Sequence, residues 1–152
     1  MNPNRPFCKA LLHGLTAASR TIPLRYLQCK RLRAYEEGLA AYRAGRYREA
    51  LVGLRPHARR GDPLAQLTLG NIYKNGLGVD KNLAQAARWY YKAAVQGDAD
   101  AQFSLAVIYF SGAVVSTHEG EATDWLERAA AQGHRCARYV YRYMHGGDRA
   151  VP

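Results

Sequence analysis

Histidine and cysteine are the residue types in this 152-residue chain best suited to hold a metal ion or act as a nucleophile. The histidines are His13, His57, His118, His134 and His145. No two of them stand four residues apart beside a carboxylate, which is what a helical metal site requires. The cysteines are Cys8, Cys29 and Cys136. Because three cysteines cannot all pair and none belongs to a C-x-x-C motif, neither a disulfide framework nor a zinc site is indicated.

Motifs for phosphate binding and nucleophilic catalysis are equally weak. Gly76 and Gly78 resemble half of a phosphate-binding loop, but no G-K-[ST] follows them. The chain has no G-x-S-x-G and no S-x-x-K motif, so no serine stands out as a nucleophile. We therefore expect a protein that is not an enzyme and that uses no cofactor or metal. The two glycines are assigned to a turn between structural elements.

The elements that carry these residues repeat with a period of 36. Residues 61–96 begin GDPLAQLTLGNIYKNG and residues 97–132 begin GDADAQFSLAVIYFSG. Fourteen of the 36 aligned positions are identical, where composition alone would give roughly two. A third copy opens at Gly133. A period in this range is typical of stacked units that bury their apolar faces against their neighbours, which favours a binding function over catalysis.

Within each unit the apolar residues have helical spacing and predict a hairpin of two helices. The first helix of residues 61–96 has one apolar face, made of Ala65, Leu69, Ile72 and Tyr73, and the second has another, made of Ala86, Trp89, Ala93 and Ala94. Asp62 before Pro63 predicts a helix N-cap, and Gly97 and Gly133 stand where a helix needs a left-handed residue to end. We expect the small residues to let the backbones approach closely, while Trp89 and Tyr73 fill the remaining volume.

These residues carry a family resemblance. The pattern A-x-x-x-L-G-x-x-Y-x-x-G-x-G-V, followed by A-x-x-W-Y-x-K-A-A-x-x-G, resembles the Sel-one-like repeat, a relative of the tetratricopeptide repeat. Residues 61–96 match it almost throughout. The second copy departs from it at Ala106, Val114 and Leu126, which leaves its loop geometry less well defined.

The resemblance implies an all-α fold, a short right-handed α-solenoid of helical hairpins. Its segments would be a basic N-terminal extension (1–33), a leading tetratricopeptide-like hairpin (34–60), two full repeats (61–96 and 97–132) and a polar capping helix (133–147). Tyr139, Tyr141 and Tyr143 alternate with other residues in the last segment, so at least one of these rings should be exposed on a helix.

Members of this family are mostly scaffolds or adaptors, so the resemblance implies a protein or peptide partner. In such hairpins the first helix of each repeat lines the concave face, and three positions around the motif leucine look inward. The candidate binding residues on this basis are Tyr35, Leu39, Tyr42, Leu67, Asn71, Lys74, Phe103, Val107, Phe110, Tyr139 and Tyr143. Such a groove would suit an amphipathic helix or an extended peptide. The alternative is that these rings pack between hairpins or beneath the chain's own N-terminal segment.

Charge is concentrated in the first 60 residues, which hold 13 Lys or Arg and three acidic residues and so account for the whole net charge of +10. A basic arm is therefore a second candidate site, with Arg20, Arg25, Lys30, Arg31 and Arg33 as its candidate residues. It would bind nucleic acid, an anionic surface or an acidic protein, and its binding would fall steeply with salt. The simpler alternative is a solvated extension with a helix at its end.

The first residues partly resemble a targeting signal. The segment MNPNRPFCK precedes a short apolar patch, ALLHGLTAA, which His13 and Gly14 interrupt. We expect a cytoplasmic protein, with export through a weak N-terminal signal as the alternative. No apolar run approaches the roughly 18 residues that a membrane-spanning helix needs.

Overall fold

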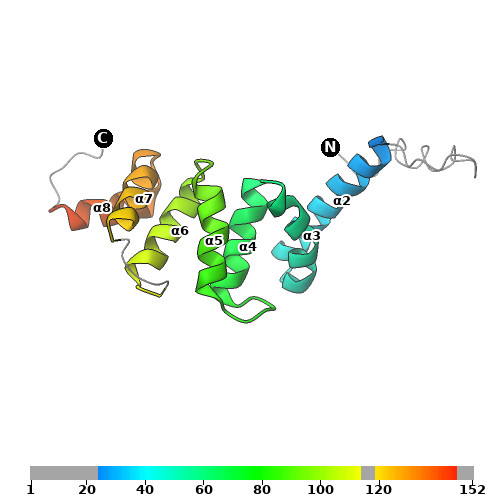
Figure 1. Ribbon diagram of the computed structural model, residues 1–152, viewed down its shortest axis with the longest axis horizontal. Helices are drawn as coiled ribbons and strands as arrows, with labels where there is room; N and C mark the ends of the chain where they lie inside the picture. The colour runs from blue at the N-terminus through cyan, green and yellow to red at the C-terminus, as the bar shows by residue number, and fades with distance from the viewer. Residues whose placement is uncertain (1–23, 114–118, 147–152) are drawn as a thin grey trace, which may run out of the picture. The chain divides into compact units, whose positions relative to one another are not determined.

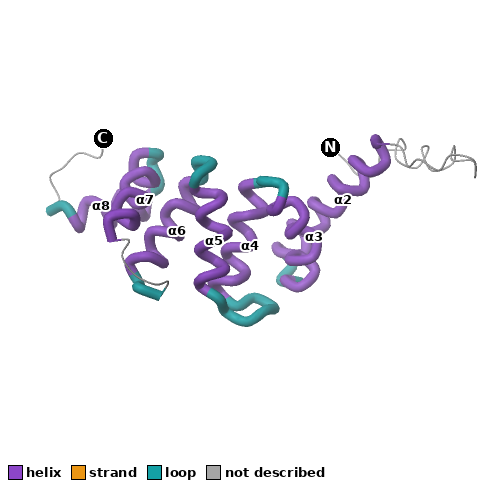
Figure 2. The backbone as a smooth tube through the Cα atoms, viewed as in Figure 1, coloured by secondary structure: helices purple, strands orange, loops and turns teal. Residues whose placement is uncertain are grey.

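A computed structural model describes residues 24–113 and 119–146 of the chain. This described part contains seven α-helices and no strand. In chain order they are α2 (Leu24–Arg43), α3 (Tyr47–Arg59), α4 (Pro63–Asn75), α5 (Leu83–Ala94), α6 (Ala99–Phe110), α7 (Glu119–Ala131) and α8 (Arg135–Met144) (Figure 1). The helices follow one another along the chain and are joined by loops and turns (Figure 2).

The chain forms two compact units that divide within α3, one ending at Leu54 and the other beginning at Arg55. In the first unit, α2 and the start of α3 approach closely at two glycines. A Cβ on Gly53 would lie 3.1 Å from the Cα of Gly38, and Leu54 is fully buried against Gly38. The small residues predicted to bring backbones together therefore have this role in the leading hairpin too.

In the second unit each helix packs on the next, α4 on α5, α5 on α6, α6 on α7 and α7 on α8. One continuous apolar core runs from α5 to α8 and consists mostly of alanines, with larger side chains such as Leu105 and Leu126. No single hairpin contains this core, because each helix contributes one face to a shared interior. The prediction of an all-α solenoid of repeated hairpins is confirmed.

Helix boundaries in this unit recur with the period of the sequence. Asp62, Asp98 and His134 each cap a first helix, and their side chains accept a hydrogen bond from the backbone N–H three residues later at 2.7, 2.8 and 3.1 Å. The predicted cap at Asp62 is confirmed. Gly97 and Gly133 have φ angles of 95° and 88°, so these helix-ending positions have the predicted left-handed backbone.

Tyr90 is the large side chain buried in the first full repeat, where the sequence had pointed to Trp89 and Tyr73. Tyr90 is fully buried, whereas Trp89 and Tyr73 are half-buried. The buried stripe of α5 consists of Ala86, Ala87, Tyr90, Ala93 and Ala94. With 100° between successive residues, Tyr90 lies at the centre of this stripe and Trp89 at its edge. The indole of Trp89 instead lies beneath Lys92, whose Nζ is 4.7 Å from the ring centroid.

Gly70 makes room for this ring. A Cβ on Gly70 would lie 2.5 Å from Cε1 of Tyr90, closer than two non-bonded carbons can approach. The Tyr90 hydroxyl donates a hydrogen bond to Oδ1 of Asn71 at 2.7 Å. The ring therefore packs directly against the backbone of Gly70, and its hydroxyl is bound by Asn71.

Three positions change together in the second repeat. Gly70, Asn71 and Tyr90 are replaced by Ala106, Val107 and Leu126. Both Ala106 and Leu126 are buried. The shorter Leu126 leaves space for the methyl group of Ala106, and with no hydroxyl to bind, an asparagine is not needed. Two departures from the family pattern, Ala106 and Leu126, are thus the two halves of one alternative packing arrangement.

Two glutamines tie successive hairpins together. Gln66 is buried, its Nε2 donates to the carbonyl oxygen of Ala58 at 2.9 Å, and its Oε1 accepts from Nε2 of Gln96 at 2.8 Å. The equivalent bonds of the second repeat join Gln102 to Ala94 at 3.1 Å and to Gln132 at 2.8 Å. Each buried carboxamide has both of its ends satisfied, as burial of a polar group requires. Sequence reasoning did not single out these glutamines, although both copies share them.

We predict that Gly70→Ala destabilises the protein by about 1–2 kcal/mol, because overpacking against Tyr90 outweighs the better helix propensity of alanine. In a Tyr90→Leu background the same change should be neutral or stabilising by up to about 1 kcal/mol. Urea unfolding of the double-mutant cycle measures both values. Gly120→Ala is the matched control, because a Cβ on Gly120 in α7 would meet open space. Equal effects of Gly70→Ala in the two backgrounds would contradict the packing argument.

Replacing Gln102 by Glu should lower the free energy of unfolding at pH 7 by about 3 kcal/mol, because a buried carboxylate oxygen would face the carbonyl oxygen of Ala94. Protonation restores a donor, so much of the loss should disappear near pH 4. Urea titrations at the two pH values give the difference. Gln85→Glu, in the first turn of α5, should have little effect or stabilise slightly. A loss at Gln102 that does not depend on pH would contradict the assigned hydrogen bond.

Candidate protein-binding surface

The predicted binding residues of the second unit lie at equivalent turns of three helices, α4, α6 and α8. We call this set the first-helix row: Leu67, Asn71, Lys74, Phe103, Val107, Phe110, Tyr139 and Tyr143. Because they stand 36 residues apart, Leu67, Phe103 and Tyr139 occupy one repeat position, and Asn71, Val107 and Tyr143 another. Each of the three helices therefore presents the same two positions of the repeat.

Exposure increases along this row toward the C-terminal end. The α4 members are half-buried, as is Phe103 at the start of the α6 set. Val107 and Phe110 are 41% and 40% exposed, and Tyr139 and Tyr143 are 74% and 83% exposed. The expectation that at least one tyrosine of the last helix is exposed is confirmed, since Tyr139 and Tyr143 point outward while Tyr141 is buried.

Phe103 also takes part in packing between hairpins. Its ring stacks on the imidazole of His134, with centroids 4.6 Å apart and planes 28° from parallel. His134 lies 3.2 Å from Asp100 through Nε2 and caps α8 through Nδ1. The alternative reading, in which the rings pack within the stack, therefore describes Phe103 better than it describes Val107 or Phe110.

Asn71 is already engaged inside the protein. Its Oδ1 accepts the hydrogen bond from Tyr90, and its backbone oxygen accepts one from Nδ2 of Asn75 at 3.0 Å. Sequence reasoning placed Asn71 on the surface as a hydrogen-bonding group for a peptide. The structure shows that the side-chain oxygen of Asn71 is occupied by the hydrogen bond from Tyr90. The N–H groups of its amide are then the groups that can donate to a ligand.

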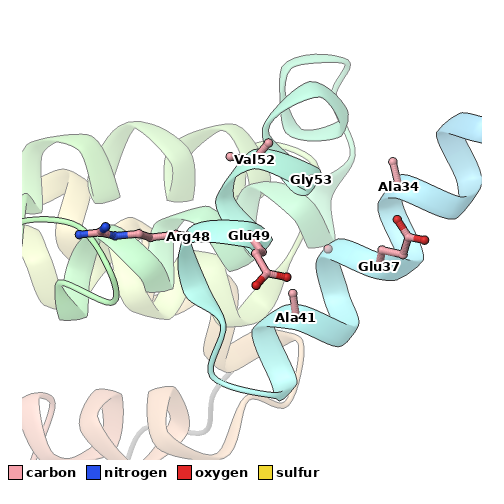
Figure 3. Close-up of a pocket in the computed structure, with 8 residues that line it drawn as sticks. Ala34, Glu37, Ala41, Arg48, Glu49, Val52 and Gly53 are labelled. Carbon is pink, nitrogen blue, oxygen red and sulfur yellow. The ribbon is translucent and has the colours of Figure 1, made fainter.

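In the first unit, the predicted residues Tyr35, Leu39 and Tyr42 lie on α2 and are half-buried. The ring of Tyr42 packs edge-on against Tyr47 at the start of α3, with centroids 5.7 Å apart. None of the three lines the hollow of about 440 Å³ between α2 and α3. That hollow is bordered by small residues such as Ala34, by Val52, and by three charged residues, Glu37, Arg48 and Glu49 (Figure 3).

Of the candidate basic arm, the structure describes the part that lies on α2. Arg20 falls outside the described residues, and of Arg25 only the backbone is described. Lys30, Arg31 and Arg33 are exposed. Arg33 pairs with Glu37 through Nε and Oε1 at 2.7 Å, and this hydrogen bond raises the pKa of the guanidinium. One of the three described cations is thus partly neutralised by its own helix.

Three arginines of α8 were not included in any candidate site by sequence reasoning. Arg135, Arg138 and Arg142 are exposed and stand three and four residues apart, a spacing that places them on neighbouring turns of one helix. This spacing was the available signal. Net charge did not reveal these arginines, because residues 61–152 hold equal numbers of cationic and acidic residues and the local excess of cations on α8 is averaged out.

The described residues contain no cluster of three or more His, Cys, Asp or Glu side chains that could hold a metal ion. None of the described helices is long and apolar enough to cross a membrane. No described side-chain polar atom is buried without a hydrogen-bond partner.

Comparisons with known proteins agree with this geometry. The Sel1 repeat matches residues 63–98 and again residues 99–134. A Sel1 repeat protein from Oxalobacter formigenes has a similar crystal structure, with a TM-score of 0.68 and 38% identity, over 72% of this chain and 45% of that one. The protective antigen c5321, present in uropathogenic Escherichia coli strains and described as having an SLR fold, gives a TM-score of 0.70 and 25% identity, over 78% of this chain and 26% of that one.

Among curated proteins, the chitin synthase regulator SKT5 of Saccharomyces cerevisiae is 51% identical over 37 residues, which are 24% of this chain and 5% of that protein. The chain spans less than half the length of each of these three relatives. Sel1 repeats are generally modules for protein–protein interaction. Residues 63–134 of the chain thus consist of two consecutive Sel1 repeats.

Proposed function

We propose that this protein is a non-enzymatic adaptor that binds a peptide or helix of a partner protein on the first-helix row. The observation that carries the proposal is the exposure of Val107, Phe110, Tyr139 and Tyr143 in a unit whose other large apolar side chains mostly close into one core. Exposed aromatic and aliphatic side chains of this kind are typical anchors of a protein interface. The general role of Sel1 repeats supports the same class of function.

The row differs along its length in what it offers a partner. On α4 it is half-buried and partly polar, through Asn71 and Lys74. On α6 and α8 it is exposed and mainly apolar. We therefore place the energetically dominant contacts of the adaptor on α6 and α8, where docking would remove the most apolar surface from water.

Exposed Lys30 and Arg31 on α2 favour a second candidate function, binding of nucleic acid or an anionic surface through the basic arm. The two functions differ in their response to salt. Binding through the arm would weaken steeply as ionic strength rises, because counterions compete for the same cations. Binding through exposed apolar side chains would change little.

We expect Val107→Asn with Phe110→Asn to remove proteins that the full chain retains from a native extract at high salt. Both side chains are already about 40% exposed, so the changes should leave the fold intact, whereas Phe103→Ala would also remove the stacking partner of His134. Quantitative mass spectrometry of the retained proteins, beside thermal unfolding of each variant, measures the effect.

Val95→Asn with Ala131→Asn is the matched control for this experiment. These two positions are also 36 residues apart and exposed, but they follow or end the second helices α5 and α7, away from the row. Retention of the same proteins by both double variants would refute the proposed site. Loss of retention by the control alone would place the interface on the second helices.

A further inference from the structure

The solvent-facing side of α8 combines arginine and tyrosine. Arg135, Arg138, Tyr139, Arg142 and Tyr143 are all exposed. At 100° per residue, Arg135, Tyr139 and Arg142 fall within about 60° of one another, and the buried Ala137 and Tyr141 lie on the opposite side. From the first of these arginines to the last, the helix rises by about 10 Å. Arginine and tyrosine are, with tryptophan, the residues enriched among the dominant contacts of protein interfaces.

Within residues 24–113 and 119–146, no ion pair balances the positive charge of this side. The sequence has no acidic residue between Glu127 and Asp148. No side chain of Arg135, Arg138 or Arg142 forms an ion pair with another described residue. Three guanidinium groups therefore stand together with their hydrogen-bonding capacity turned to solvent.

Two of these arginines replace residues on which hairpin packing depends. Arg138 stands at the repeat position of Gln66 and Gln102, and Arg142 at that of Gly70 and Ala106. In the first full repeat, Gln66 and Gly70 receive the second helix and its Tyr90. An arginine cannot accept a ring at the position where even one methyl group would clash. In the third copy this side of the first helix is therefore unsuited to packing against a second helix of the repeat. It carries positive charge instead.

We infer that α8 is the docking site for a short acidic segment of a partner protein. The segment would carry two or three carboxylates for the arginines and at least one apolar side chain for Tyr139 and Tyr143. Bidentate geometry makes arginine well suited to carboxylate recognition. This inference rests on the proposed function, because the two tyrosines belong to the first-helix row, and it assigns the chemistry of the partner at that end.

Two other occupants fit less well. A second copy of the chain docked symmetrically through α8 would bring three arginines against three arginines, and like charges in contact oppose association. A nucleic acid would extend beyond α8, and the adjacent helix α7 carries Glu121, Asp124 and Glu127, of which the first two are exposed. These carboxylates would repel a continuous phosphate backbone. A peptide segment that ends with α8 avoids them.

The test uses the full chain as bait for a phage-displayed library of random peptides of roughly twelve residues, enough to span α8 in an extended conformation. Selected peptides should be enriched in Asp or Glu together with Leu, Phe or another apolar residue. Synthetic copies are then measured by fluorescence anisotropy against the wild type. The variant Arg135→Gln/Arg138→Gln/Arg142→Gln should bind them about tenfold or more weakly, since each exposed ion pair contributes a factor of roughly two to five.

The control Lys81→Gln/Arg88→Gln/Lys92→Gln removes the same amount of charge from exposed positions in the loop before α5 and in α5 itself, and it should bind like the wild type. The inference would be overturned if no peptide is selected or if the selected peptides are not enriched in acidic residues. It would also be overturned if the two triple variants bind equally, or if an equimolar oligothymidylate displaces the peptides. Peptides that lack acidic residues but are lost with Val107→Asn/Phe110→Asn would retain the proposed function while refuting this inference. Peptides lost with neither set of changes would refute both.

Discussion

The packing of Tyr90 against Gly70 fixes how one hairpin of this protein closes, and the rest of the stack builds on that closure. A ring with no space for even a methyl group beneath it sets the separation of α4 and α5, and its hydroxyl sets their register through Asn71. The second repeat reaches the same closure with a smaller pair, Ala106 and Leu126. Because every helix in the second unit packs on the next, errors in one closure would propagate to the neighbouring interfaces.

The fold was largely predictable from the sequence, since a repeat exposes its own pattern. Asp62, Gly97 and Gly133 mark helix boundaries by residue type alone, because capping and left-handed backbone have few solutions. The identity of the buried ring was not predictable in the same way. Trp89 matches the repeat in both copies and Tyr90 does not, yet in the first copy Tyr90 is buried and Trp89 is half-buried, whereas Trp125 of the second copy is buried. Identity between the two copies shows that a position is constrained in both. It does not show which of two adjacent residues on a helix faces the core, because that depends on how the helix is rotated about its own axis.

The residues of the first-helix row divide into exposed and covered ones for a related reason. Spacing predicted which turns of the first helices are equivalent, but whether a side chain there is exposed depends on neighbours from other hairpins. Phe103 is partly covered because His134, one repeat later, stacks on it, while Phe110 has no such partner among the described rings. Asn71 shows a further limit, because its surface amide is also the internal partner of Tyr90. A packed core of small and aromatic residues thus holds a few exposed side chains in place. Such an arrangement suits binding better than catalysis.

Site-specific photocross-linking tests the central claim, that partners contact the first helices. A photoreactive phenylalanine analogue placed in turn at Phe110, Tyr143 and Val95 of the full chain, and irradiated in native extract, reports which positions lie within reach of a bound protein. All three side chains are at least 40% exposed, so the probe itself is tolerated equally. The account predicts covalent adducts from positions 110 and 143 and none above background from position 95. Adducts from position 95 with none from the other two would contradict it.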